Sequence, residues 1–214
     1  MIGNNSCGPH SMLAGKTVEN ILELDVLTVD GERFTVGPTS EAELAEIVRG
    51  NDRRAEIYRE LKAIRDEYAD DIRQHFPTIK RRVSGYNLDQ LLPENGFNVA
   101  KALVGSEGTC IAVLSARTQL IRNPASKQLV VVGYDNIYEA GDSVPSLLEF
   151  KPIAMEGLDW SIVGGLIDRN LRLDDVARLP EGKAWILTEL AADSDAELES
   201  DTQAFMQALS LIHI

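Results

Sequence analysis

Residues 104–113 (VGSEGTCIAV) combine glycine, a carboxylate and a hydroxyl in a spacing that suits contact with a ligand. Gly105 and Gly108 bracket Glu107, and Thr109 follows before an apolar run begins. Glycine at such positions allows a positive φ or a close approach to a flat ligand, and bare loop amides can form an anion-binding concavity. The same pattern is also typical of an ordinary tight loop before a buried strand.

Two further stretches carry similar features. Residues 1–8 (MIGNNSCG) are small and polar, and Gly3 and Gly8 allow close backbone approach, while Pro9 prevents a helix from continuing. A disordered terminus is the alternative interpretation of this stretch. Residues 83–88 (VSGYNL) place a glycine, a tyrosine and an asparagine together shortly before the 104–113 loop.

In this order, residues 1–8, 83–88 and 105–109 resemble the FAD-binding (PCMH-type) domain of the vanillyl-alcohol oxidase-type flavoproteins. The likeness is to the branch of D-lactate, glycolate and D-2-hydroxyglutarate dehydrogenases. In that family an Asn/Thr-rich turn ending in Ala/Cys-Gly and a Gly-Ser-Glu-Gly-Thr-Leu-Gly-Ile loop both touch the flavin. The resemblance covers nearly the whole chain and implies an α+β fold, an FAD cofactor, a small 2-hydroxy acid substrate and an electron acceptor.

The resemblance also implies which side chains contact FAD. They are Asn4, Asn5, Ser6, Cys7, Gly8, Glu107, Gly108, Thr109, Cys110, Ile111 and Val113. Cys110 and Ala112 depart from the family, which usually has Leu and Gly there, so one position loses volume and the other gains a methyl group. For Cys7, a small packing residue is favoured over a redox thiol.

The residues expected on the substrate side are Arg82, Tyr86 and Asn87, because this segment runs close to the flavin in the resembling family. Arg82 and Tyr86 would supply a cation and a hydroxyl for an anionic substrate or a reduced flavin. A surface arginine and a tyrosine in the core are the alternative. The catalytic residues remain unknown, since His10, His75 and His213 do not lie in the family's histidine context.

The elements that must position these residues follow from periodicity. Residues 18–29 read as a strand, Asp30-Gly31 as a two-residue hairpin signal, and 32–36 as the return strand. A helical insertion is expected over 39–76, opened by a capping box at Ser40 and Glu43. It is interpreted as packed on the sheet, although a lid or docking role is the alternative.

The second half alternates between strand and helix. Strands are expected at 129–132, 153–155 and 183–190, and helices at 137–148, 159–171 and from 194 on. This order fits a ferredoxin-like cap. With a break at 123–126, residues 1–124 are assigned to the C-terminal part of an FAD-binding PCMH-type domain. Residues 125–214 are assigned to the N-terminal part of an FAD-linked oxidase C-terminal (cap) domain.

Composition limits the remaining possibilities. The 214 residues carry a net charge of −13, which disfavours nucleic-acid binding because phosphate backbones are repelled. No apolar run reaches the ~20 residues that span a bilayer, and the amino terminus lacks the pattern of a signal peptide. Two cysteines form no disulfide framework, which favours the cytoplasm, and no metal-ligand spacing is present.

The resulting hypothesis is a fragment of an FAD-dependent oxidoreductase that oxidises a D-2-hydroxy acid by hydride transfer to FAD. D-2-hydroxyglutarate and D-lactate are both considered, with a preference for the large iron–sulfur-fused D-2-hydroxyglutarate dehydrogenases, whose clusters or metal ion would lie outside this chain. The family's pyrophosphate loop is missing, and residues 210–214 resemble translated read-through. The alternatives are a folded, non-catalytic fragment or subunit that does not hold FAD by itself, and an oxidase or ether-lipid synthase on the same fold.

Overall fold

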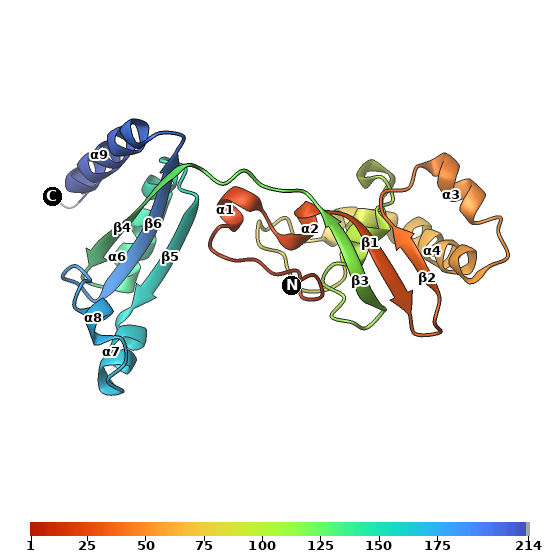
Figure 1. Cartoon of the computed structure of the whole chain (residues 1–214), viewed down its shortest axis with the longest axis horizontal. Helices are drawn as coiled ribbons and strands as arrows, with labels where there is room; N and C mark the ends of the chain where they lie inside the picture. Colours follow the sequence, from red (N-terminus) through yellow and green to blue (C-terminus); the bar gives the residue numbers. More distant parts are fainter. Residues whose placement is uncertain (213–214) are drawn as a thin grey trace. The chain divides into compact units, whose positions relative to one another are not determined.

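A computed structural model describes residues 1–212, so His213 and Ile214 at the expected read-through tail lie outside the described part. The chain divides into two compact units. The first contains residues 1–8 and 15–121, and the second contains residues 9–14 and the described chain from 122 on (Figure 1). The assignment of named domains to residues 1–124 and 125–214 stays a prediction.

The first unit is built on a three-stranded antiparallel sheet in the order β2-β1-β3. The strands are β1 (Ile21–Thr28), β2 (Arg33–Val36) and β3 (Ile111–Thr118). The helical elements are α2 (Thr17–Asn20), α3 (Glu41–Ile47), α4 (Arg53–His75), η1 (Leu88–Leu91), η2 (Pro93–Asn95) and α5 (Val99–Leu103).

The β1–β2 hairpin forms where the Asp30-Gly31 signal predicts it, but its loop is longer than two residues. The Thr28 amide donates to the Glu32 carbonyl at 2.9 Å, which leaves three residues in the loop. Gly31 has a φ of +92°, as expected for a type I turn followed by a left-handed residue. The preceding strand begins at Ile21 rather than at residue 18, because residues 17–20 form one helical turn.

Helices α3 and α4 are the helical insertion that the sequence predicts. The Ser40 hydroxyl accepts from the Glu43 amide at 3.2 Å, and the Glu43 carboxylate accepts from the Ser40 amide at 2.9 Å, which completes the expected capping box. Tyr58 of α4 is 1% exposed and packs with Leu44 and Phe97 in the core of the first unit. The insertion is therefore packed against the sheet and its neighbouring helices.

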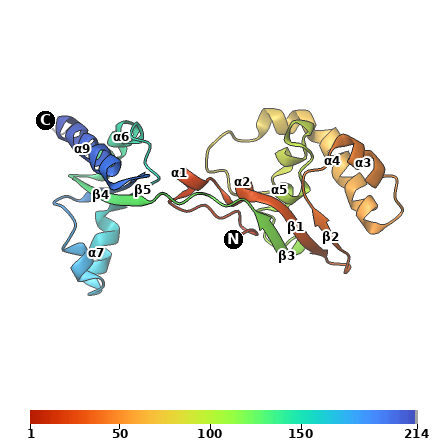
Figure 2. The same cartoon turned by 45° about the horizontal axis from the view of Figure 1, so that its top comes forward.

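The second unit also has a three-stranded antiparallel sheet, in the order β4-β6-β5. Its strands are β4 (Ser126–Tyr134), β5 (Ala154–Asp159) and β6 (Ala184–Ala192). Its helices are α1 (Ser11–Ala14), α6 (Ile137–Leu148), α7 (Trp160–Asp168), α8 (Leu173–Val176) and α9 (Asp195–Ile212). Helices α6 and α9 lie on the same side of this sheet (Figure 2).

The alternation of strands and helices in the second unit follows the sequence expectation closely. Asp159 caps α7 through the Ser161 and Ile162 amides, as predicted, but the helix ends at Asp168 instead of Leu171. The reason is Asn170, whose φ of +53° is left-handed and ends the helix. The expected α+β fold class is confirmed. None of the helices within residues 1–212 is long and apolar enough to cross a membrane.

Candidate functional site

The amino-terminal turn and the 104–113 loop, although about a hundred residues apart in sequence, are joined by two backbone hydrogen bonds. The amide of Gly105 donates to the carbonyl of Ile2 at 3.0 Å, and the amide of Glu107 donates to the carbonyl of Gly3 at 2.7 Å. The two stretches that the sequence singled out therefore form one structure.

Residues 106–109 make a tight turn. The Thr109 amide donates to the Ser106 carbonyl at 3.0 Å, and the Thr109 hydroxyl donates to the same carbonyl at 2.6 Å. Both central residues have positive φ, +51° at Glu107 and +74° at Gly108, as in a type I′ turn. An L-residue such as Glu107 rarely adopts this conformation, so its bond to Gly3 helps to hold it there.

Gly105 lies against the amino-terminal turn in a space that is tight for a side chain. Its φ is +87°, and a Cβ there would lie 3.3 Å from Cβ of Asn5 and 3.4 Å from the carbonyl oxygen of Gly85. Gly108 also has positive φ, but a Cβ there would meet no atom within 4 Å. The two glycines therefore have different roles: Gly105 permits close packing on the amino-terminal turn, and Gly108 leaves open space beside the 106–109 turn.

Asn5 lies beneath this loop and is fully buried. Its Oδ1 accepts a hydrogen bond from the Val18 amide at 3.0 Å, and its own φ of +46° is one that asparagine tolerates better than most residues. Its Nδ2 is buried and donates to none of the residues described. A buried donor without an acceptor is unfavourable, so a polar ligand at this position would complete the site.

Cavities of roughly 300–1,000 Å³ hold small molecules and cofactors, and one of about 620 Å³ opens beside the turn. Its walls combine backbone-rich and apolar surfaces from the two joined stretches. They are Met1, Ile2, Gly3, Leu103, Ser106, Gly108, Ile111, Ala112 and Val113. The apolar wall and the open glycine fit the face of a flat cofactor, whereas Asn5 with its unpaired donor lies beneath the loop and does not line this cavity.

The three residues expected on the substrate side all contact the loop or each other. Asn87 is buried and its Nδ2 donates to the carbonyl of Val104 at 2.7 Å, directly before Gly105. Arg82 donates to Asn87 Oδ1 at 3.2 Å and forms an ion pair with Asp89 at 2.6 Å. In this arrangement Arg82 and Asn87 hold the chain that leads into the turn.

Tyr86 is 49% exposed, so the alternative of a core tyrosine is wrong. Its hydroxyl lies 2.8 Å from the Thr109 hydroxyl at the end of the turn. Tyr86 and Arg82 also line a second cavity of about 690 Å³, together with His75. His75 could not be assigned a role from the sequence, because its position at the end of α4 carries no motif and only the fold brings it to this cavity.

The other residues expected to contact FAD occupy different surroundings. Ser6 donates through its hydroxyl to Asn4 Oδ1 at 2.8 Å, and its carbonyl accepts from the Thr17 hydroxyl at 2.9 Å. Cys7 is half-buried and Cys110 is exposed, and both are free thiols. Of the expected set, only Gly108, Ile111 and Val113 line the 620 Å³ cavity. Ile2 and Leu103 line it too, and nothing in an ordinary apolar residue could have marked them in the sequence.

No group of three His, Cys, Asp or Glu side chains within residues 1–212 is arranged to hold a metal ion. His10 belongs to the second unit, where its Nε2 lies 2.5 Å from a Glu189 carboxylate oxygen. The His75 Nδ1 lies 3.1 Å from the carbonyl of Asp71. The absence of a metal site from the whole chain stays an expectation.

In sequence, the chain is similar to proteins named as dehydrogenases. It is 31% identical to D-2-hydroxyglutarate dehydrogenase of Pseudomonas putida over 98% of this chain and 21% of that protein. It is 27% identical to the Escherichia coli (strain K12) enzyme of the same name, over 82% of this chain and 17% of the relative. The chain thus spans about one fifth of the length of these relatives. No family model matches the chain.

Comparison of structures identifies the fold. Two structures of an alkyldihydroxyacetonephosphate synthase superpose on 99% of this chain with TM-scores of 0.51 and 0.52. They are 11% and 10% identical to it, and the match covers 31% and 32% of their chains. At such identities the likeness establishes the fold alone. The resemblance noted at residues 1–8, 83–88 and 105–109 is confirmed. Over nearly its whole length, this chain is similar in sequence to one segment of the D-2-hydroxyglutarate dehydrogenases, and it shares its fold with the solved synthase structures.

Proposed function

We propose that this chain is a segment of an FAD-dependent enzyme that oxidises a D-2-hydroxy acid, with D-2-hydroxyglutarate as the first candidate and D-lactate as the second. The observation that carries the proposal is the 31% identity to a D-2-hydroxyglutarate dehydrogenase over 98% of this chain. In this proposal residues 1–124 belong to an FAD-binding PCMH-type domain and residues 125–214 to an FAD-linked oxidase C-terminal domain. The compartment is the cytoplasm, and the electron acceptor is a separate molecule.

The first unit supplies the surface that holds the cofactor. In this proposal Asn5 Nδ2, which is buried without an acceptor in the protein, would donate a hydrogen bond to a polar atom of FAD. The side chains of Ile111 and Val113 would cover a ring face, and Gly108 would leave room for close backbone approach. When bound, FAD would supply the acceptor for the hydride of the substrate's α-carbon, and the residues of this chain would supply position and electrostatics.

The substrate side of the proposal is the 690 Å³ cavity lined by Arg82, Tyr86 and His75. Because the guanidinium of Arg82 is already paired with Asp89, its first task is to orient Asn87 and the loop. The Tyr86 hydroxyl, which contacts Thr109, is free to turn toward a ligand because the side chain is half-exposed. The cavity is also lined by the imidazole of His75 and the carboxylate of Asp71, and we take His75 as the first candidate for the group that accepts the proton of the substrate hydroxyl.

The competing proposal is a folded segment that does not hold FAD by itself. It is favoured by the small share of the relatives' length that this chain spans, 21% and 17% for the two dehydrogenases described above. A synthase activity has weaker support, since the solved synthase structures share the fold at 10–11% identity. The two leading proposals differ in what they predict for FAD binding by the isolated chain and by the longer protein.

The test is to produce both the 214-residue chain and a longer protein extended by its flanking sequence, and to titrate each with FAD. We expect the longer protein to show a flavin absorption spectrum that bleaches on addition of D-2-hydroxyglutarate more readily than with D-lactate. A longer protein that shows no flavin spectrum after FAD is added would refute the flavoenzyme proposal. Bleaching with D-lactate alone would identify D-lactate, the second candidate, as the substrate.

The matched variants are Asn5→Asp and Asn51→Ala. Asn5→Asp keeps an oxygen that can accept from Val18 but replaces the unpaired donor by a buried negative charge, whereas Asn51 is exposed and lines neither proposed cavity. In the longer protein we expect Asn5→Asp to weaken FAD binding about tenfold or more, because a donor is lost and a buried charge is added, and Asn51→Ala to leave it nearly unchanged. Equal affinities for both variants would remove Asn5 from the cofactor site.

A further inference from the structure

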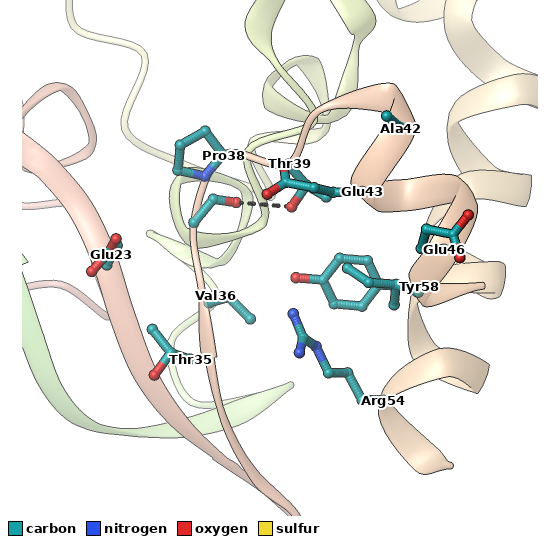
Figure 3. A pocket seen from close by; sticks show the side chains of 12 residues that line it. Glu23, Thr35, Val36, Pro38, Thr39, Ala42, Glu43, Glu46, Arg54 and Tyr58 are labelled. Carbon is teal, nitrogen blue, oxygen red and sulfur yellow. Dashed lines mark hydrogen bonds between the residues drawn. The ribbon is translucent and has the colours of Figure 1, made fainter. Parts of the chain in front are cut away.

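A separate cavity of about 590 Å³ lies in the first unit, among β2 and helices α3 and α4. Its walls are partly apolar, from Val36, Pro38, Ala42 and Ile47, and Tyr58 and Arg54 reach it from α4 (Figure 3). It shares no lining residue with the cavity beside the Ser106–Thr109 turn. It is therefore distinct from the site proposed for the cofactor.

Arg54 is the cation of this cavity, and it has no polar partner among residues 1–212. Its guanidinium carbon lies 5.4 Å from the centre of the Tyr58 ring and 6.0 Å from that of Phe34, which fixes its direction by cation–π contact. Its Nε is buried without an acceptor. A guanidinium that is held in place and partly desolvated is unfavourable without an anionic or hydrogen-bonding partner, so an anionic ligand would stabilise it.

Arg54 is exceptional among the arginines of its own unit. Every other arginine there donates a hydrogen bond to a described carboxylate or backbone carbonyl: Arg33, Arg49, Arg53, Arg59, Arg65, Arg73, Arg81, Arg82 and Arg117. In a chain with 34 acidic residues and 21 basic ones, an arginine without a counterion runs against the overall charge balance. The missing partner of Arg54 is thus a specific feature of the cavity.

The carboxylates at the edge of this cavity are engaged elsewhere. Glu23 is paired with Arg117 at 2.7 Å, Glu46 with Arg49 at 2.5 Å, and Glu43 accepts from Ser40 at the start of α3. None of them neutralises Arg54. Together they place negative charge around the opening, which disfavours a doubly charged ligand such as phosphate.

Tyr58 adds a second polar group. Its ring is buried in the core, its hydroxyl bonds to no residue in the described chain, and Figure 3 shows the hydroxyl and the Arg54 guanidinium both pointing toward β2. Thr35 of β2 also lines the cavity, but its side chain lies on the other side of the strand from Arg54 (Figure 3). A guanidinium fork with a hydroxyl beside it matches the two oxygens of a carboxylate, which arginine binds in a bidentate manner.

We propose that this cavity binds a small monocarboxylate with a compact apolar body. The carboxylate pairs with Arg54 and accepts from Tyr58, and the apolar body lies against Val36, Pro38 and Ile47. A single charge satisfies Arg54 and meets about half the repulsion that a dianion would meet from Glu23, Glu43 and Glu46. This cavity is separate from the one proposed for the cofactor, and binding there does not depend on FAD.

The test is an NMR titration of the 214-residue chain with benzoate, observing the Nε–H resonance of Arg54 and the backbone amides of β2. We expect saturable shifts of these resonances with benzoate, none with uncharged benzyl alcohol, and weaker binding of inorganic phosphate than of benzoate. Absence of saturable shifts with benzoate would overturn the proposal. Tighter binding of phosphate than of benzoate would overturn the ligand class.

Variants assign the effect to Arg54. We expect Arg54→Gln to weaken benzoate binding about tenfold or more, as loss of a charge-assisted bidentate bond does, and Tyr58→Phe to weaken it about threefold. Arg73→Gln is the matched control, because Arg73 is an exposed arginine of the same helix, is paired with Glu94 and does not line this cavity, and it should leave affinity nearly unchanged.

Glu46→Gln keeps the test decisive if Arg54→Gln disturbs the fold. This substitution removes an exposed rim charge without touching the core, and it should tighten benzoate binding because a repulsion is lost. Equal benzoate affinity in the unmodified chain, Arg54→Gln and Glu46→Gln would show that Arg54 only covers Phe34 and Tyr58.

Discussion

The turn at residues 106–109 and the cavity beside Arg54 belong to the same unit, yet their polar groups differ in how they are satisfied. Around the turn, the backbone amides of Gly105, Glu107 and Thr109 all have protein acceptors at 2.7–3.0 Å. Beside β2, the Arg54 guanidinium has two aromatic rings and no acceptor. The turn is marked in the sequence by glycines, whereas the cavity carries no motif.

The difference separates two kinds of site. Gly105 and Gly108 both have a positive φ, a backbone conformation that favours glycine. Because this requirement concerns single residues, it can be recognised in the sequence. The pairing state of Arg54 depends on which side chains the fold brings near it, and no spacing of residues in α4 reveals that. In the turn, the unsatisfied group is a single donor, Nδ2 of Asn5, beneath a closed backbone frame.

The largest expected effect tests how closed that frame is. Gly105→Ala adds a methyl group 3.3 Å from Asn5 and forces an L-residue to a φ of +87°, so we expect it to destabilise the first unit by about 2–3 kcal/mol. Gly108→Ala has the φ penalty without the crowding and should lose about 1 kcal/mol. Urea unfolding followed by NMR resonances of the first unit measures both.

Equal losses for the two glycine variants would contradict the close packing of Gly105 on Asn5. The second unit provides the internal reference, because its resonances should unfold at the same urea concentration in both variants. A shift of both units together would mean that they unfold as one, and the comparison would then rest on the difference between the two variants.

Asn87 tests the support behind the turn. Asn87→Ala removes the donor to the buried carbonyl of Val104 and leaves that carbonyl unsatisfied, so we expect a loss of about 2 kcal/mol. Asn95→Ala is the matched control, since Asn95 also donates to one backbone carbonyl, that of Asp89, but from an exposed site. It should lose less than about 1 kcal/mol. Hydrogen exchange of the Gly105 and Glu107 amides reads out the effect at the turn.

If Asn95→Ala were as destabilising as Asn87→Ala, burial would not be the reason for the role of Asn87. If neither variant changed exchange at Gly105, the chain leading into the turn would be held by the two bonds to Ile2 and Gly3 alone.

The fold of this chain could be predicted from its sequence to a large extent because its signals are local. The capping box at Ser40, the cap at Asp159 and the period-two pattern over 183–190 each predict an element that the structure contains. Where the prediction is wrong in detail, a single residue decides the outcome, such as Asn170 in its left-handed conformation at the end of α7.

The candidate site could be predicted only in part, and for a physical reason. The glycine-rich stretches were visible, and they do meet. Their neighbours were not, because Ile2 and Leu103 look like any apolar residue and His75 reaches its cavity only through the packing of α4. Likewise Arg82 looked like a free cation in sequence, and only the structure shows its partner Asp89.

A smaller effect is expected from Tyr86→Phe. The Tyr86 hydroxyl meets the Thr109 hydroxyl at 2.8 Å from a half-exposed position, so its loss should cost no more than about 0.5–1 kcal/mol. Its informative readout is the affinity of the longer protein for its substrate compared with its affinity for FAD. A change in substrate affinity alone supports the substrate side of the cavity, and a change in FAD affinity alone assigns Tyr86 to the turn.

The smallest expected effect concerns Arg73, which is paired with a carboxylate and therefore serves as the reference for the unpaired Arg54. Arg73 donates to Glu94 at 2.8 and 3.0 Å and lowers the pKa of Glu94 from 4.5 to about 2. Because the pKa is lowered in the folded state, this ion pair contributes above pH 4.5 and is lost as the pH falls toward 2, and its exposure keeps the contribution small.

We therefore expect the carboxylate of Glu94 to remain ionised at about pH 3.5, where an ordinary glutamate is mostly protonated, when followed by its carboxyl ¹³C shift. Over the same range the Nε–H resonance of Arg54 should stay constant in the absence of ligand, because no described carboxylate is paired with it. A pH-dependent shift of the Arg54 Nε–H resonance that follows the protonation of Glu23, Glu43 or Glu46 would reveal a counterion at the rim of the cavity. That result would bring Arg54 into line with the other arginines of its unit and end the contrast with the turn.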